Sequence, residues 1–194
     1  MNPFDRAVLV WLNSLHGFAP FDGLMRVIAT DYLLPLAFAM SLVALWFIGK
    51  GREQRFNYQM AALQGMCSLG FSNIAVWQIN LAWDRPRPFE LLPGQLDLLF
   101  YPPTDPSFPA NPVAVGFAVG AAIWRVNRRF GAAVLVCATL YGFSRVYAGV
   151  FWPTDIIGGA AVGVVGTWGA VWFGRLLEPL PTLAIRLGRA LGLA

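Results

Sequence analysis

Apolar residues fill five long stretches of this chain, separated by short polar segments. The stretches cover residues 32–48, 58–79, 113–124, 130–147 and 156–173. A helix needs about 20 mainly apolar residues to cross the hydrocarbon layer of a bilayer. Four stretches approach that length, and the third does so if its flanking residues are included. The pattern therefore predicts five membrane-spanning helices.

The two ends of the chain have a different, amphipathic pattern. In NPFDRAVLVWLNSL, apolar residues recur at helical spacing, and Asp5, Arg6 and Asn13 lie opposite them. We expect residues 1–30 to form an interfacial or partly inserted helix. Residues 176–194 form a basic amphipathic tail, which we expect to lie on anionic lipid headgroups. Residues 1–194 are predicted to be a single integral membrane domain.

Composition and charge agree with a membrane protein. The chain is 57% hydrophobic and only 12% charged, and its mean hydropathy is +0.58. Basic residues follow the first, third and fifth stretches: Lys50, Arg52, Arg55, Arg125, Arg128, Arg129, Arg175, Arg186 and Arg189. Because cytoplasmic loops retain Lys and Arg, we expect those ends and the C-terminus to be cytoplasmic. Residues 81–112 and 149–155 would then face outward, into the periplasm of a bacterial inner membrane. This bias accounts for the net charge of +4, so we expect no nucleic-acid partner.

Three polar segments lie at the outward ends of the predicted helices. They are NLAWDRPRP at 80–88, SFPANP at 107–112 and SRVYAGVFWPTD at 144–155. Arginine pairs bidentately with phosphate oxygens, so arginines from separate helix ends would form a phosphate clamp at the membrane surface.

These segments resemble the motifs of the type 2 phosphatidic acid phosphatase (PAP2) superfamily. Ser144, Arg145 and Asp155 are in register with its third motif, and Arg87 with Pro88 fits the first. The resemblance implies an all-α, six-helix membrane bundle. In active members it also implies removal of phosphate from a lipid phosphate or diphosphate: one histidine attacks phosphorus and a second protonates the leaving group. We expect no cofactor and no metal site.

The chain departs from the family pattern where the chemistry takes place. Phe151 stands at the position of the nucleophilic histidine, Pro112 at that of the general acid, Ala110 at that of a serine and Asn80 at that of a lysine. A phenyl ring cannot form a phosphoenzyme, and proline has no side-chain proton to give. The single histidine, His16, lies in the amphipathic start, where we expect an interfacial or packing role.

The residues that remain resemble the binding half of such a site. Arg87, Arg145, Arg85 and the amide of Asn80 are the predicted phosphate ligands, and Asp155 is what remains of the catalytic set. A structural alternative is that Arg145 pairs with Asp155 or with helix-end carbonyls and only holds the fold, because buried ions need partners.

We therefore expect a catalytically inactive, PAP2-like pseudo-phosphatase. It would bind a phospholipid or isoprenoid phosphate without hydrolysis, or serve as an accessory subunit of a membrane protein complex. One alternative is an active lipid phosphate or diphosphate phosphatase with an unconventional nucleophile such as Asp155 or Ser144. Another is a transporter or flippase of a lipid-linked phosphate.

Overall fold

The computed structural model describes residues 2–192, and within that range it contains helices and no strand. The helices are α1 (Pro3–Asn13), α2 (Ala19–Ile28), α3 (Leu33–Phe47), α4 (Gly51–Ala82), α5 (Pro88–Leu91), α6 (Asn111–Trp124), α7 (Arg128–Tyr147), α8 (Pro153–Leu176) and α9 (Leu180–Ala190). The prediction of an all-α bundle is confirmed.

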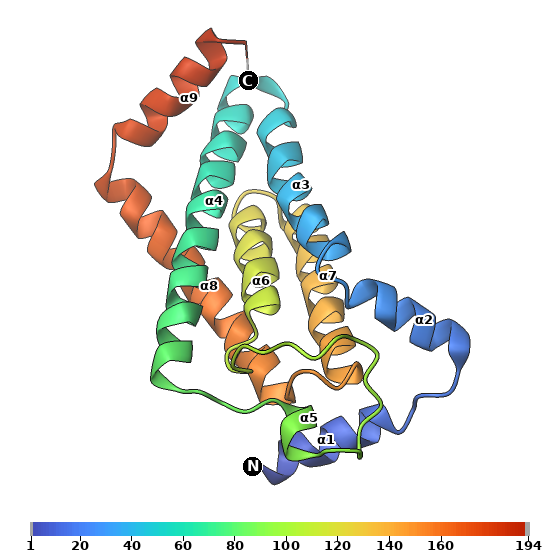
Figure 1. Ribbon diagram of the computed structural model, residues 1–194. Helices are drawn as coiled ribbons and strands as arrows, with labels where there is room; N and C mark the ends of the chain where they lie inside the picture. The colour runs from blue at the N-terminus through green and yellow to red at the C-terminus, as the bar shows by residue number, and fades with distance from the viewer. Residues whose placement is uncertain (1, 193–194) are drawn as a thin grey trace.

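Helix α6 lies at the centre of the bundle and packs against α4, α7 and α8, while α3 covers α4 and α6. Helices α1 and α5 and the long irregular segment before α6 gather at one end of the bundle (Figure 1). The α3–α4 turn and α9 lie at the opposite end. The bundle thus has two separate ends at which polar groups can assemble.

Fewer helices qualify as membrane spans than the sequence predicted. By length and composition α7 and α8 qualify among the described residues, and α2 with α3 would make a third span, bent by 49°. Helix α6 has 14 residues, about 21 Å at 1.5 Å per residue, which is shorter than the hydrocarbon layer. Helix α4 has 32 residues, but its Gln, Asn and Ser residues and its charged first turns lower its hydropathy. The prediction of five spans counted both α4, despite its polar residues, and the short α6.

Small residues set the close packing around α6. A Cβ atom at Gly163 of α8 would lie 2.3 Å from the Ala114 carbonyl oxygen, and one at Gly159 would lie 2.4 Å from the Ala110 carbonyl oxygen. The two glycines are four residues apart, so they place one face of α8 directly against the backbone of α6. This GxxxG spacing therefore serves packing inside the bundle.

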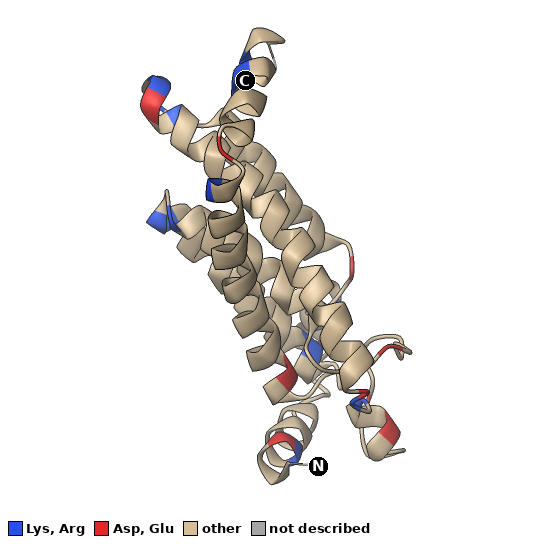
Figure 2. Ribbon diagram, turned by 90° about the vertical axis from the view of Figure 1, so that its left-hand side faces the viewer, with Lys and Arg blue, Asp and Glu red and all other residues tan. Residues whose placement is uncertain are grey.

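The charged residues separate between the two ends of the molecule. Figure 2 shows Lys and Arg at the end that carries the α3–α4 turn and the C-terminus. Most Asp and Glu residues lie toward the other end, together with a few arginines. The middle of the bundle is almost free of charge, as expected for helices surrounded by lipid.

The α6–α8 contact makes Gly163→Ala a test of the packing. The added methyl group would meet the Ala114 carbonyl oxygen, so we expect a loss of about 1–3 kcal/mol of unfolding free energy. Unfolding in mild detergent, followed by tryptophan fluorescence, measures it. Gly169→Ala on the same helix is the control, because no atom lies within 4 Å of its added Cβ. Equal stability of the two variants would contradict the packing.

Candidate active site

The three motif segments meet at the end of the bundle that carries α1 and α5. The Ser107 amide donates to the Arg85 carbonyl at 2.9 Å, and the Ala110 amide donates to the Asp155 carbonyl at 3.1 Å. The segment before α6 is therefore hydrogen-bonded both to the segment after α4 and to the start of α8. The predicted convergence of the three segments is confirmed.

Arg85 lies between two carboxylates and a hydroxyl group. Its Nη1 donates to Asp155 Oδ1 at 2.5 Å and to Thr154 Oγ1 at 2.8 Å, and its Nη2 donates to Asp5 Oδ2 at 2.7 Å. The arginine side chain is 15% exposed, whereas both carboxylates are fully buried. Asp155 also caps α8, because its Oδ2 accepts from the Trp152 amide at 2.8 Å. Arg85 is therefore the cation of this cluster that reaches solvent.

Asp5 and Thr154 form a second close pair within the cluster. The Thr154 hydroxyl donates to Asp5 Oδ2 at 2.7 Å, and the Thr154 amide donates to Asp5 Oδ1 at 3.0 Å. A hydroxyl group that donates to a buried carboxylate is the arrangement by which a base activates an oxygen nucleophile. The sequence analysis singled out neither residue for chemistry.

The N-terminal segment lies deeper than its amphipathic pattern suggested. Asp5 and Asn13, expected on the polar face of an interfacial helix, are both buried. The Asn13 amide donates to the Asp97 carbonyl at 3.0 Å, which satisfies the buried group. His16 packs its ring against that of Tyr147, with centroids 4.4 Å apart, and does not line the cavity beside Arg85. The polar side of this segment therefore packs on the protein, while apolar residues such as Phe4 and Trp11 stay exposed, and the interfacial position of residues 1–30 stays a prediction.

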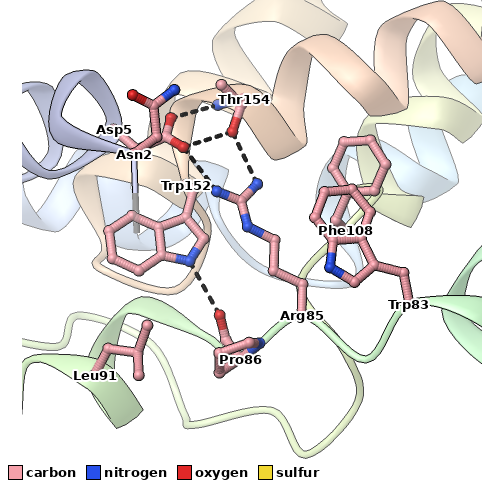
Figure 3. Close-up of a pocket in the computed structure, with 9 residues that line it drawn as sticks. All are labelled: Asn2, Asp5, Trp83, Arg85, Pro86, Leu91, Phe108, Trp152 and Thr154. Atoms are coloured by element: carbon pink, nitrogen blue, oxygen red, sulfur yellow. Dashed lines mark hydrogen bonds and ion pairs between the residues drawn. The ribbon is translucent and has the colours of Figure 1, made fainter.

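A cavity of about 480 Å³ opens beside Arg85 (Figure 3). Its lining residues are Asn2, Asp5, Trp83, Arg85, Pro86, Leu91, Phe108, Trp152 and Thr154. Figure 3 shows the Arg85 guanidinium directed toward Asp5 and Thr154, with Trp152 on one side and Trp83 and Phe108 on the other. The cavity therefore combines one cation, a hydroxyl–carboxylate pair and apolar walls.

Arg87 is buried close to this cavity and has partners within the protein. Its Nε and Nη2 donate to the backbone and side-chain oxygens of Asp105 at 2.7 and 2.9 Å, and its Nη1 donates to the Val150 carbonyl at 2.9 Å. Its guanidinium lies 4.4 Å from the centre of the Phe151 ring. Burial lowers the pKa of Arg87, and the Asp105 carboxylate opposes that shift. These contacts hold two outer loops together.

Arg145 also has partners within the protein. They are not Asp155 or the helix-end carbonyls that the sequence analysis considered as its partners. It forms an ion pair with Asp31 and donates to the Tyr141 hydroxyl at 2.8 Å. The ring centre of Phe100 lies 4.1 Å from its guanidinium. Asp155, which we considered as its partner, instead pairs with Arg85.

The positions of the missing catalytic groups are occupied by apolar packing. Phe151 is buried in a cluster with Ala110 and Val113, and Pro112 lies in the first turn of α6, where proline suits a helix start. The Asn80 amide, with its nitrogen facing the backbone, donates to the Phe108 carbonyl at 2.7 Å. Binding of phosphate by Arg87, Arg145 and Asn80 stays a prediction.

Residues 60–177 match the family model of the PAP2 superfamily. The chain belongs to this superfamily. It resembles undecaprenyl-diphosphatase BcrC of Bacillus subtilis (strain 168), with 26% identity over 181 residues that cover 92% of this chain and 90% of that protein. It has the fold of LpxE from Aquifex aeolicus, with a TM-score of 0.67, 22% identity and coverage of 88% and 96% of the two chains. A PAP2-type phosphatidylglycerolphosphate phosphatase from Bacillus subtilis gives a TM-score of 0.61, 18% identity and coverage of 90% and 86%.

These PAP2 relatives overturn the expectation of an inactive protein. One of them is an enzyme by name, an undecaprenyl-diphosphatase. The expectations of a pseudo-phosphatase and of an accessory subunit were wrong because they equated two missing histidines with lost activity. The alternative of an active lipid phosphatase with another nucleophile is the one that the relatives favour.

Arg87→Lys tests the structural contribution of the buried arginine. An ammonium group cannot reproduce three donors directed to Asp105 and Val150, so we expect a loss of about 1–3 kcal/mol of unfolding free energy. Detergent unfolding measures it, with Arg6→Lys as the control because Arg6 is exposed. If Arg87→Lys were as stable as the control, these hydrogen bonds would not hold the loops.

Proposed function

We propose that this PAP2 chain is an integral membrane phosphohydrolase that removes the terminal phosphate of an isoprenoid diphosphate. The Arg85 cavity is its active site, and the outward, periplasmic side of a bacterial inner membrane is its location. The observation that carries the proposal is the group of Arg85, Thr154 and Asp5 in one cavity at the end of the bundle. The similarity to BcrC, named an undecaprenyl-diphosphatase, supports the substrate class.

Arg85 would bind the terminal phosphoryl group. Guanidinium pairs with phosphate oxygens in a planar, bidentate geometry, and the flanking carboxylates fix its orientation before substrate arrives. The indole and phenyl rings of Trp83 and Phe108, whose centroids lie 4.8 Å apart, offer an apolar wall for the first part of the lipid chain. The cavity thus suits a ligand with a charged head and an apolar tail.

Thr154 would act as the nucleophile and Asp5 as its base. Thr154 Oγ1 attacks the terminal phosphorus, an Oγ1–P bond forms, and the bond to the bridging oxygen breaks. The hydroxyl proton passes to Asp5 Oδ2, which lies 2.7 Å away, and the lipid monophosphate leaves. Water then attacks the phosphothreonine, the P–Oγ1 bond breaks, and the proton on Asp5 returns to Oγ1. One water proton stays on the released phosphate and the other passes to solvent.

The two nucleophiles suggested by the sequence fit the cavity less well. Ser144 is buried in α7 and donates its hydroxyl to the Tyr141 carbonyl at 2.7 Å. Asp155 uses one carboxylate oxygen for Arg85 and the other for the Trp152 amide. Thr154 lines the cavity and already donates to a carboxylate.

The missing general acid favours a diphosphate over a monophosphate. Cleavage of a diphosphate releases a phosphate ester, whose second pKa is about 6, so this group leaves without being protonated. Cleavage of a monophosphate releases an alkoxide, which is far more basic and needs a proton donor. Pro112 supplies none. The chemistry of the leaving group therefore favours the substrate class for which BcrC is named.

The purified chain in detergent should therefore release inorganic phosphate from undecaprenyl diphosphate much faster than from undecaprenyl phosphate. General acids contribute about 10²–10⁴-fold, so we expect a rate ratio of at least about 100. Phosphatidylglycerol phosphate, the monoester of an alcohol, should resemble the monophosphate. Equal rates on the three lipids would refute the leaving-group argument, and no release from any of them would refute the proposed function.

Thr154 variants test the nucleophile. We expect Thr154→Val to lose diphosphatase activity by on the order of 10³-fold or more, and Thr154→Ser to retain it. Thr182→Val is the control, because the Thr182 hydroxyl donates to Glu178 in the C-terminal tail, far from the cavity.

Asp155→Asn distinguishes Thr154 from Asp155 as the nucleophile. It should abolish turnover if Asp155 is the nucleophile. If Thr154 attacks, reduced but measurable turnover should remain, because the amide oxygen introduced at position 155 can still accept from Arg85 Nη1. Unfolding curves of each variant exclude simple misfolding.

A further inference from the structure

A second arginine-lined cavity lies at the opposite end of the bundle from the Arg85 cavity. Its volume is about 370 Å³, and its lining residues are Gly49, Gly51, Arg52, Arg55 and Arg189. It forms where the α3–α4 turn meets α9, the amphipathic helix near the C-terminus (Figure 1). It shares no lining residue with the proposed active site.

The three guanidinium groups of this cavity have no anionic partner among the residues that the structure describes. Within residues 2–192, none of them forms an ion pair, whereas Arg85, Arg87 and Arg145 at the other end all do. Arg189 donates from Nε and Nη2 to the neutral Gln59 Oε1, at 3.1 and 2.8 Å. Three like charges around one cavity repel one another, and a bound anion would relieve that repulsion.

The backbone fixes the shape of this cationic cavity. The α3–α4 turn folds tightly onto α4, since a Cβ atom at Gly49 would lie 2.9 Å from Arg55 Cα. Gly49 has a φ of +147° and Gly51 a φ of +82°, values that favour glycine. Helix α4 begins at Gly51, so the positive end of its dipole adds to the charge of the arginines.

An apolar groove begins beside this cavity and runs between α3 and α4. Its volume is about 440 Å³, and it is lined only by apolar side chains: Ala39, Leu42, Val43, Trp46, Phe47, Ala62, Leu63, Met66 and Leu69. Phe47 precedes Gly49 of the cationic cavity by two residues. Trp46 also borders α9, because a Cβ atom at Gly188 would lie 3.5 Å from Trp46 Cζ2. A charged cavity and an apolar groove therefore adjoin at one end of the bundle.

We infer that this is a binding site for an anionic glycerophospholipid. Arg52, Arg55 and Arg189 hold the headgroup phosphate, and the α3–α4 groove holds an acyl chain. Arg52 and Arg55 are three residues apart on α4, so they present their side chains on one face. The site binds lipid without hydrolysis, because its lining includes no hydroxyl, thiol, carboxylate or imidazole group. It is independent of the proposed phosphatase activity.

Native mass spectrometry of the purified full chain tests this site. Detergent micelles are supplemented with phosphatidylglycerol or with phosphatidylcholine of the same chain length, and bound lipid is counted. We expect one retained phosphatidylglycerol, and a weakening of about 30-fold in the double variant Arg52→Gln/Arg55→Gln. The control is Arg128→Gln/Arg129→Gln, which removes the same charge from the exposed first turn of α7. Equal retention of phosphatidylcholine, or equal loss in both double variants, would overturn the site.

A second comparison separates a lipid site from a general phosphate site. Val43→Trp places a large side chain in the groove, and Val136→Trp places one on the exposed surface of α7. We expect Val43→Trp to weaken phosphatidylglycerol binding, while Val136→Trp leaves it unchanged. Glycerol 3-phosphate should compete only weakly. If it bound as tightly as phosphatidylglycerol, or if Val43→Trp had no effect, the groove would not hold an acyl chain. Unfolding curves confirm that each variant is folded.

Discussion

The Arg85 guanidinium lies between two buried carboxylates and joins segments that are far apart in the sequence. Asp5 belongs to α1, Asp155 and Thr154 belong to α8, and Arg85 follows α4. Breaking a buried ion pair by removing one partner costs about 3–5 kcal/mol, and here two carboxylates would lose their partner together. The position of α1 over the end of the bundle depends on this side chain. The cavity also depends on it, because Asp5 of α1 and Asn2, which caps α1, form part of the cavity wall.

The Phe151 ring explains why chemistry would move from the position of the family's histidine to the neighbouring cavity. The ring is 3% exposed and lies beneath the Arg87 guanidinium, so water and substrate have no access to that position. The polar groups that remain open are those around Arg85. A diphosphate suits them because its leaving group needs no proton donor, which makes the loss of the acid at Pro112 tolerable. Phe151 and Pro112, the two departures from the family pattern, are thus both consistent with an enzyme that cleaves diphosphates but not monophosphates.

The sequence predicted those features that depend on periodicity and on motif spacing. The apolar periodicity predicted the helix bundle. The spacing from Ser144 to Asp155 indicated the family and predicted that the three motif segments lie close together. The sequence did not reveal that Asp5 belongs to the site. An acidic residue on the polar face of an amphipathic helix has the same sequence pattern whether it faces solvent or pairs with a buried arginine. The pairing of Arg145 with Asp31 depends on the bend between α2 and α3, which no local pattern encodes.

The two ends of the bundle use arginine in different ways. Arginines at the α1 end are held by carboxylates, so their positive charge is largely offset while their orientation is fixed. Fixed orientation is what catalysis requires, because donors that are already aligned need not reorganise as charge develops on the phosphoryl group. Arginines at the α9 end lack ion-pair partners among the described residues, so their charge attracts anions without fixing a reacting geometry. Arginines that attract an anion without a fixed orientation are suited to hold a lipid headgroup. In the two proposed sites the same side chain would serve reaction at one end and lipid binding at the other, and the presence or absence of carboxylate partners would decide which.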